Sequence, residues 1–68
     1  MVKVMGISTN PDTKKATVSL FADTKTEVTS GMTIEGMPSG YEIEAGSSVF
    51  TADADVAFMK SDGSWNWV

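Results

Sequence analysis

Apolar and polar residues alternate along much of this chain, and they do not recur at the spacing of an amphipathic helix. The alternation is clearest over residues 15–22, where every second residue from Ala16 to Leu20 is apolar and most of the others are polar. Residues 2–8 alternate as well, and Asn10-Pro11-Asp12 lies between the two runs and is rich in turn-forming residues. We therefore predict an antiparallel hairpin of residues 2–8 and 15–22.

The middle of the chain predicts shorter elements. Residues 23–27 are polar and form either one helical turn capped by Asp23 or a solvated loop, and the shortness of the segment favours the loop. Val28 and Thr33-Ile34-Glu35 are candidates for short edge strands, and Tyr41-Glu42-Ile43-Glu44 alternates again.

The C-terminal third predicts a second hairpin. Residues 55–60 and 65–68 are rich in strand-forming side chains, and Asp62-Gly63 between them is a strong hairpin signal. A two-residue turn at Asp62-Gly63 would pair Phe58 with Trp67. In that register one face of the hairpin carries Val56, Phe58, Trp65 and Trp67. An isolated hairpin is marginal in water, so this aromatic face is expected to pack on something.

Together these segments predict a single all-β domain over residues 1–68, with no linker that divides the chain. The expected architecture is a small antiparallel barrel or sandwich built from hairpins, with at most one short helical turn near residues 23–27.

The size of the chain changes this picture, because a domain of 68 residues buries only about 60% of its unfolded surface and is marginally stable. Such domains usually gain stability from disulfides, a metal or a partner subunit. The sequence contains no Cys and no His, which excludes disulfides and makes a zinc site unusual. We therefore expect a homo-oligomer or a chain bound to a larger assembly.

The charge excludes some partners. The net charge is −4, with five Lys and no Arg. Nucleic acids and anionic membrane surfaces attract basic proteins, so we expect neither as a partner. No apolar run is long enough to span a bilayer, and the apolar start of the chain is too short for a signal peptide. We expect a soluble protein that is made in the cytoplasm.

The residue types argue against catalysis. With no His and no Cys, the serines lack an activating base, which leaves carboxylate pairs such as Glu42 with Glu44 or Asp53 with Asp55. A chain this short offers little room for a substrate cleft, so these carboxylates are better explained as charges that keep the sheet soluble. Asp53-Ala54-Asp55 lacks the glycine and distal glutamate of a calcium-binding EF-hand loop. We predict no enzyme, no catalytic residue, no metal and no cofactor.

The aromatic residues near the C-terminus are the strongest candidates for a functional surface. Trp65 and Trp67 suit the core of a small barrel, an anchor for another protein, or a platform that stacks on sugar rings, and the core is the first expectation. Our candidate partner-binding residues are Phe50, Phe58, Trp65 and Trp67.

Part of the chain resembles a known class of proteins. The resemblance is carried by Gly46-Ser47-Ser48-Val49-Phe50-Thr51-Ala52-Asp53, by Asp55-Val56-Ala57-Phe58-Met59 and by Ser61-Asp62-Gly63-Ser64-Trp65. Ala22-Asp23-Thr24-Lys25 with Glu27-Val28 adds to it. These segments are similar to parts of small virion structural proteins of tailed bacteriophages and prophages, among them capsid-associated and head-fibre-like proteins.

This resemblance implies a non-enzymatic structural protein that is made in the host cytoplasm and attaches to the virion in many copies, on the head or the tail. Its partners would be other virion proteins or copies of itself, contacted through an apolar and aromatic face. The alternative is a small carbohydrate-binding module that uses the Trp face.

Overall fold

The computed structural model describes residues 1–29 and 31–68, and in them it is all-β, as the sequence predicts. Seven strands of the described residues form one mixed sheet, which does not close into a barrel. The expected antiparallel barrel or sandwich is therefore corrected to an open sheet with both parallel and antiparallel pairs. The elements are β1 (Val2–Asn10), β2 (Lys15–Ala22), the 3-10 turn η1 (Lys25–Glu27), β3 (Ile34–Glu35), β4 (Glu42–Ile43), β5 (Ser48–Thr51), β6 (Val56–Met59) and β7 (Trp65–Trp67).

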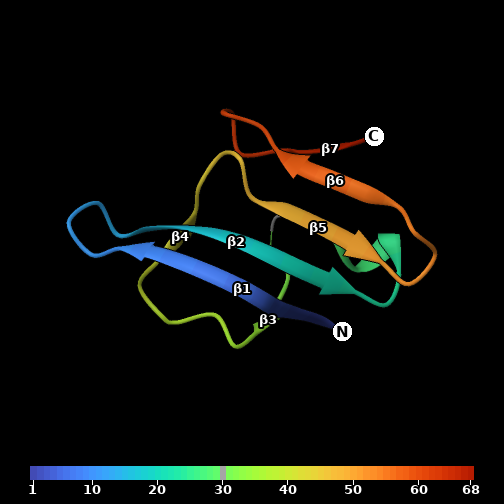
Figure 1. Cartoon of the computed structure of the whole chain (residues 1–68), viewed down its shortest axis with the longest axis horizontal. Helices are drawn as coiled ribbons and strands as arrows, with labels where there is room; N and C mark the ends of the chain where they lie inside the picture. Colours follow the sequence, from blue (N-terminus) through green and yellow to red (C-terminus); the bar gives the residue numbers. More distant parts are fainter. Residues whose placement is uncertain (30) are drawn as a thin grey trace.

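Strand β2 lies at the centre of the sheet (Figure 1). β1 pairs with one edge of β2 in antiparallel orientation, while β4 and β5 run parallel along its other edge. β3 adds in parallel to the far edge of β1, and β6 and β7 continue from β5 as an antiparallel meander. β3 lies beside β1 at one edge of the β1–β2 hairpin, and β4 lies beside β2 at the other edge. The chain therefore crosses one face of the hairpin between β2 and β3, and crosses it again between β3 and β4. We call residues 23–29 and 31–41 the crossing segment, and the face that this segment covers the inner face.

The predicted N-terminal hairpin is confirmed and extends to Asn10. The Asn10 side chain accepts a hydrogen bond from the backbone N–H of Asp12 at 3.0 Å, the local bond expected of an Asx residue in a turn. Between Val4 and Gly6 the register shifts by one residue. This bulge brings Ile7 opposite Val18, so simple alternation fails beyond it.

The core lies on the inner face of the sheet. One row of neighbouring residues crosses five strands there and consists of Val4, Leu20, Val49, Ala57 and Trp67. The crossing segment packs against this layer through Val28, Met32, Met37 and Tyr41. The predicted inward face of β2 is confirmed, and the fully or nearly fully buried apolar residues are Val2, Ala16, Val18, Leu20, Ala22, Val49 and Ala57.

A buried serine joins the elements where β4 ends and β5 begins. The Ser47 hydroxyl accepts a hydrogen bond from the backbone N–H of Val18 at 3.0 Å. Val18 lies between the part of β2 that pairs with β4 and the part that pairs with β5. The Ser47 carbonyl accepts another from the N–H of Met59 at 2.8 Å. Ser47 therefore supplies a hydrogen-bond partner that a buried backbone group needs.

The polar segment after β2 contains one 3-10 turn, and Thr24 occupies the capping position where the sequence suggested Asp23. The Glu27 carboxylate accepts hydrogen bonds from the backbone N–H groups of Asp23 and Thr24, at 3.2 and 3.5 Å. The amino group of Met1 bonds to the carboxylates of both Asp23 and Glu27. The turn thus fastens the start of β1 to the end of β2.

The predicted C-terminal hairpin exists, but the predicted register is wrong by one residue. Phe58 lies opposite Asn66, and Trp67 lies opposite Ala57. The backbone N–H of Lys60 donates to the carbonyl of Ser64 at 2.8 Å, so the loop has three residues instead of two.

Glycine explains the longer loop. The N–H of Gly63 donates to the carbonyl of Lys60 at 3.0 Å, and Gly63 has a φ of 88°. This is the arrangement of a type I turn followed by a residue in the left-handed region, a common three-residue hairpin loop. Side chains alternate between the two faces of a strand. This one-residue difference in register therefore places Trp65 and Trp67 on one face of the hairpin and Phe58 on the other.

Candidate interaction surface

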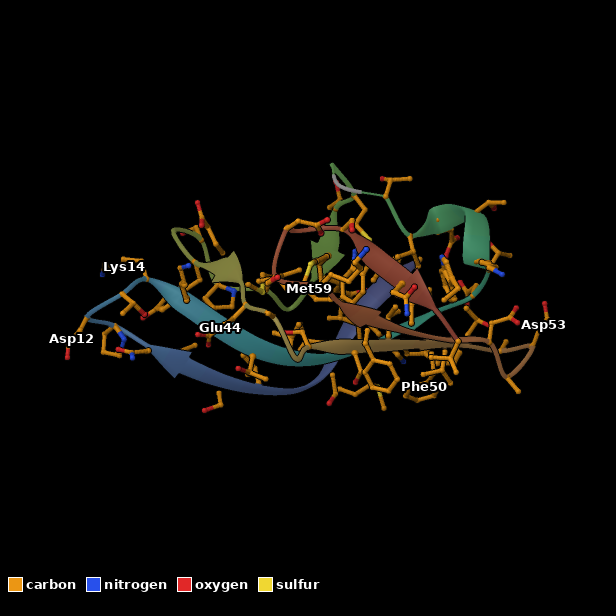
Figure 2. All side chains as sticks on the ribbon, turned by 90° about the horizontal axis from the view of Figure 1, so that it is seen from above. Asp12, Lys14, Glu44, Phe50, Asp53 and Met59 are labelled. Carbon is orange, nitrogen blue, oxygen red and sulfur yellow. The ribbon has the colours of Figure 1, made fainter. Side chains whose placement is uncertain are left out.

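The structure divides the four predicted partner-binding residues between two faces. Phe50 and Phe58 lie on the face that the crossing segment leaves open, with exposed fractions of 42% and 47%. Trp65 and Trp67 are half-buried and pack against the core on the inner face. In Figure 2 the Phe50 side chain points away from the interior in which Met59 lies. The predicted four-residue surface is therefore not one continuous surface.

The open face carries an aromatic row that crosses the centre of the sheet. Lys3, Phe21, Phe50 and Val56 are neighbours on four adjacent strands. The rings of Phe21 and Phe50 meet edge to face, with centroids 5.3 Å apart and an interplanar angle of 72°. The ammonium group of Lys3 lies 5.9 Å from the centroid of the Phe21 ring. Such pairs hold the rings in place on an exposed surface.

We call Phe21, Phe50, Val56 and Phe58 the outer aromatic patch. A shallow depression of about 370 Å³ lies over three of these residues, Phe50, Val56 and Phe58, and is bounded almost entirely by apolar atoms. The adjoining row on the same face is polar and contains Ser19, Ser48 and Asn66 beside Phe58. An apolar centre with a polar border is the composition typical of a protein-binding surface.

Sequence reasoning missed Phe21, although a signal for it was present. Leu20 points into the core, so the next residue of the same strand must point outward. The pairing of Phe21 with Phe50 carried no sequence signal, because β2 and β5 are parallel strands far apart in the chain.

The two tryptophans close the inner face near the end of the sheet. Trp67 lies beside Ala57 at the end of the core row, and the ammonium group of Lys25 lies 4.9 Å from the Trp67 ring centroid. Trp65 lies opposite Met59. The first expectation for these residues, a role in the core, matches this placement.

A second cavity lies between β7, the last strand of the open sheet, and the segments that face it. Its volume is about 380 Å³, and it separates β7 from β3, β4 and the crossing segment. We call it the seam cavity. Most of its lining is apolar, and Glu42 is its one acidic lining residue among the described residues; the full lining is Thr29, Met32, Ile34, Met37, Tyr41, Glu42, Ile43, Met59, Gly63 and Trp65.

The shifted pKa values belong to turns and to the chain start. Hydrogen bonds to Asp23 and Glu27 raise the pKa of the Met1 amino group, and the bond to that amino group lowers the pKa of Glu27. Hydrogen bonds from the Ser64 hydroxyl and backbone N–H lower the pKa of Asp62. All three groups lie outside the outer aromatic patch.

The carboxylates weighed for catalysis have separate surroundings. Glu42 lines the seam cavity, whereas the Glu44 carboxylate accepts a hydrogen bond from the Thr17 hydroxyl at 3.3 Å. Asp53 lies at the exposed turn after β5, at one end of the molecule in Figure 2. The backbone N–H of Asp55 donates to the Thr51 hydroxyl at 3.2 Å, within the same turn.

Within residues 1–29 and 31–68 no three carboxylates gather in a group that could hold a metal ion. No helix in this part of the chain has the length and apolar character needed to cross a membrane. Comparison of the chain with protein-family models, with curated protein sequences and with solved structures finds no match.

Proposed function

We propose that this chain is a non-enzymatic structural protein that attaches to a larger protein assembly through the outer aromatic patch. The observation that carries the proposal is the position of Phe50 and Phe58. Both rings are more than two-fifths exposed on a face that the chain leaves uncovered, while its own core lies entirely on the other face. Large apolar groups gathered on one face are typical of a binding surface.

The dimensions of the molecule fit this role. The chain exposes 4261 Å², and a standard protein interface removes about 800 Å² from each partner, roughly a fifth of that surface. One face of the sheet is therefore enough for a specific contact. Burial of the patch would also add apolar contacts to a domain that is marginally stable by its size.

The assembly we propose is the virion of a tailed phage or prophage. The support is the resemblance of residues 46–65 to small structural proteins of such virions. A small β-domain with one free aromatic face suits a protein that decorates or joins larger subunits in many copies. Manufacture in the host cytoplasm follows from the same proposal.

The lack of His and Cys supports the non-enzymatic part of the proposal. The Glu44 carboxylate accepts a hydrogen bond from the Thr17 hydroxyl, which gives this carboxylate a structural role without catalysis.

The proposal is tested with purified particles of the phage or prophage that encodes the chain. Mass spectrometry should find the chain in these particles in many copies. Particles grown without its gene should bind the added chain in a sedimentation assay, and the double variant Phe50→Ser/Phe58→Ser should bind at least tenfold more weakly, a loss of about 1.4 kcal/mol.

Thr17→Ser is the matched control, because Thr17 is exposed and alternates onto the same open face outside the patch. Light scattering on the free chain shows separately whether copies of the chain bind each other. Particles that lack the chain and do not take it up would refute the virion proposal. Equal binding by the double variant and the wild-type chain would refute the role of the patch.

A further inference from the structure

In the part of the chain that the structure describes, the edge of the sheet at β7 carries backbone groups without a partner strand. Among the described residues, β6 is the only strand beside β7. Phe58 pairs with Asn66, the N–H of Val68 donates to the carbonyl of Val56 at 2.8 Å, and the N–H of Lys60 donates to the carbonyl of Ser64 at 2.8 Å. Residues 64, 66 and 68 therefore direct their backbone groups toward β6.

Backbone groups in an antiparallel strand alternate in direction, so those of the intervening residues point the other way. The N–H and C=O groups of both Trp65 and Trp67 thus point out of the sheet at its free edge. An additional strand placed there would meet a regular row of two donors and two acceptors.

The edge of β7 lacks the charged residues, proline and bulges that normally prevent strand addition, although at three residues β7 is a short strand. Edge strands are usually protected by charged residues, proline or bulges. The outer edge of β1 has a bulge between Val4 and Gly6, and β3 is two residues long and contains Glu35. β7 consists of Trp65, Asn66 and Trp67, with no charge, proline or irregular register.

The seam cavity lies directly beside this edge. Trp65 and Gly63 form one side of the cavity, and the segment that carries Met32 and Met37 forms the other. A strand added to β7 would continue the curl of the sheet, and every second side chain of that strand would point inward, into the cavity. Methionine side chains are flexible and adapt to the shape of an inserted group.

We propose that β7 accepts an extended segment of another protein as an additional strand, whose alternate apolar side chains fill the seam cavity. Main-chain hydrogen bonds to Trp65 and Trp67 would supply affinity, and the cavity would select the side chains, as in other cases of strand addition. The net charge of −4 and the position of Glu42 in the cavity lining favour a segment with basic residues at its ends. This site is separate from the outer aromatic patch and does not depend on the proposed function.

Amide hydrogen exchange on the full chain tests the proposal, with a short peptide of alternating valine and threonine and a lysine at each end as the probe. In the free chain the amides of Trp65 and Trp67 should exchange quickly, while those of Asn66 and Val68 are protected. Saturating peptide should slow exchange at Trp65 and Trp67 about fivefold to tenfold, the effect of one net hydrogen bond. The same peptide with a central proline should have no effect.

A chain synthesised with an N-methyl group on Trp67 keeps the indole side chain but loses one outward donor, so the peptide should no longer protect Trp65. An N-methyl group on Asp53, in the exposed turn after β5, is the matched control and should leave binding unchanged. Circular dichroism checks that both chains fold.

Three results would overturn the proposal. The first is exchange at Trp65 and Trp67 that the peptide does not change. The second is equal protection of the chain N-methylated at Trp67. The third is protection that rises with the concentration of the chain alone, which would assign the edge to a second copy and not to another protein.

Discussion

Replacing Phe58 by serine and, separately, Trp67 by alanine distinguishes the two possible registers of the C-terminal hairpin. In the structure Phe58 points to the open face with 47% of its surface exposed, whereas Trp67 is half-buried at the end of the core row. If the two-residue turn were correct, both side chains would share one face and would respond alike.

The expected magnitudes follow from burial. Full burial of a phenylalanine side chain is worth about 1.5–3 kcal/mol, so Phe58→Ser should cost about 1 kcal/mol. Truncation of a buried tryptophan costs about 3–5 kcal/mol, and about half of this, roughly 2 kcal/mol, applies to Trp67. Loss of the contact with the Lys25 ammonium group adds about 0.5–1 kcal/mol.

Urea denaturation followed by far-ultraviolet circular dichroism measures both changes, because loss of Trp67 would weaken a fluorescence signal. Trp67→Ala should lower the free energy of unfolding by at least about 1 kcal/mol more than Phe58→Ser. Leu20→Ala provides an internal scale, since Leu20 is fully buried and its truncation should cost about 2–5 kcal/mol. Equal losses for Phe58→Ser and Trp67→Ala, or a larger loss for Phe58→Ser, would refute the assignment of the two faces.

Four further predictions concern single residues. Ser47→Ala leaves the buried N–H of Val18 without its acceptor and should cost about 1–3 kcal/mol, measured by urea denaturation. Gly63→Ala places a side chain on a residue with a φ of 88° and no steric neighbour, so thermal unfolding should show a loss of about 1–2 kcal/mol from backbone conformation alone. The folded-state pKa of Glu27 is lowered by the Met1 amino group, so its stabilising contribution is present above the unfolded pKa of about 4.3 and is lost as pH falls through the folded value. Glu27→Gln should therefore reduce the dependence of thermal stability on pH in acid, and an unchanged acid profile would contradict this linkage. The raised pKa of the Met1 amino group has the opposite sign, so its contribution is present below about pH 8 and is lost as pH rises through the folded value, which N-terminal acetylation should abolish.

The local residue pattern was sufficient to predict β1, β2 and the hairpin that they form, whereas the candidate edge strand at Val28 is wrong, because Val28 ends the 3-10 turn. Alternation from Ala16 to Leu20 identified the inward face of β2, and Asn10 made the local turn bond expected of it. These features depend on contacts between residues close in sequence, so the sequence pattern describes them directly.

The register of the second hairpin shows where local reasoning fails. Asp62-Gly63 is compatible with both a two-residue and a three-residue loop, because glycine adopts positive φ in either. The three-residue loop places Trp65 and Trp67 on the core, where their large apolar surfaces are removed from water. Tertiary packing therefore favours the register that the turn signal alone does not distinguish.

The residue pattern alone was enough to predict that this chain is all-β, and the residue types alone show that it carries no His, Cys or Arg. Which of the apolar residues are exposed depends on the tertiary fold. The parallel pairing of β2 with β5 places Phe21 beside Phe50, and the crossing segment covers one face and leaves that pair on the other. The β2–β5 pairing and the contacts of the crossing segment both join residues that are distant in the chain. Neither leaves a periodic signal in the sequence, because the energy of such contacts depends on the whole fold.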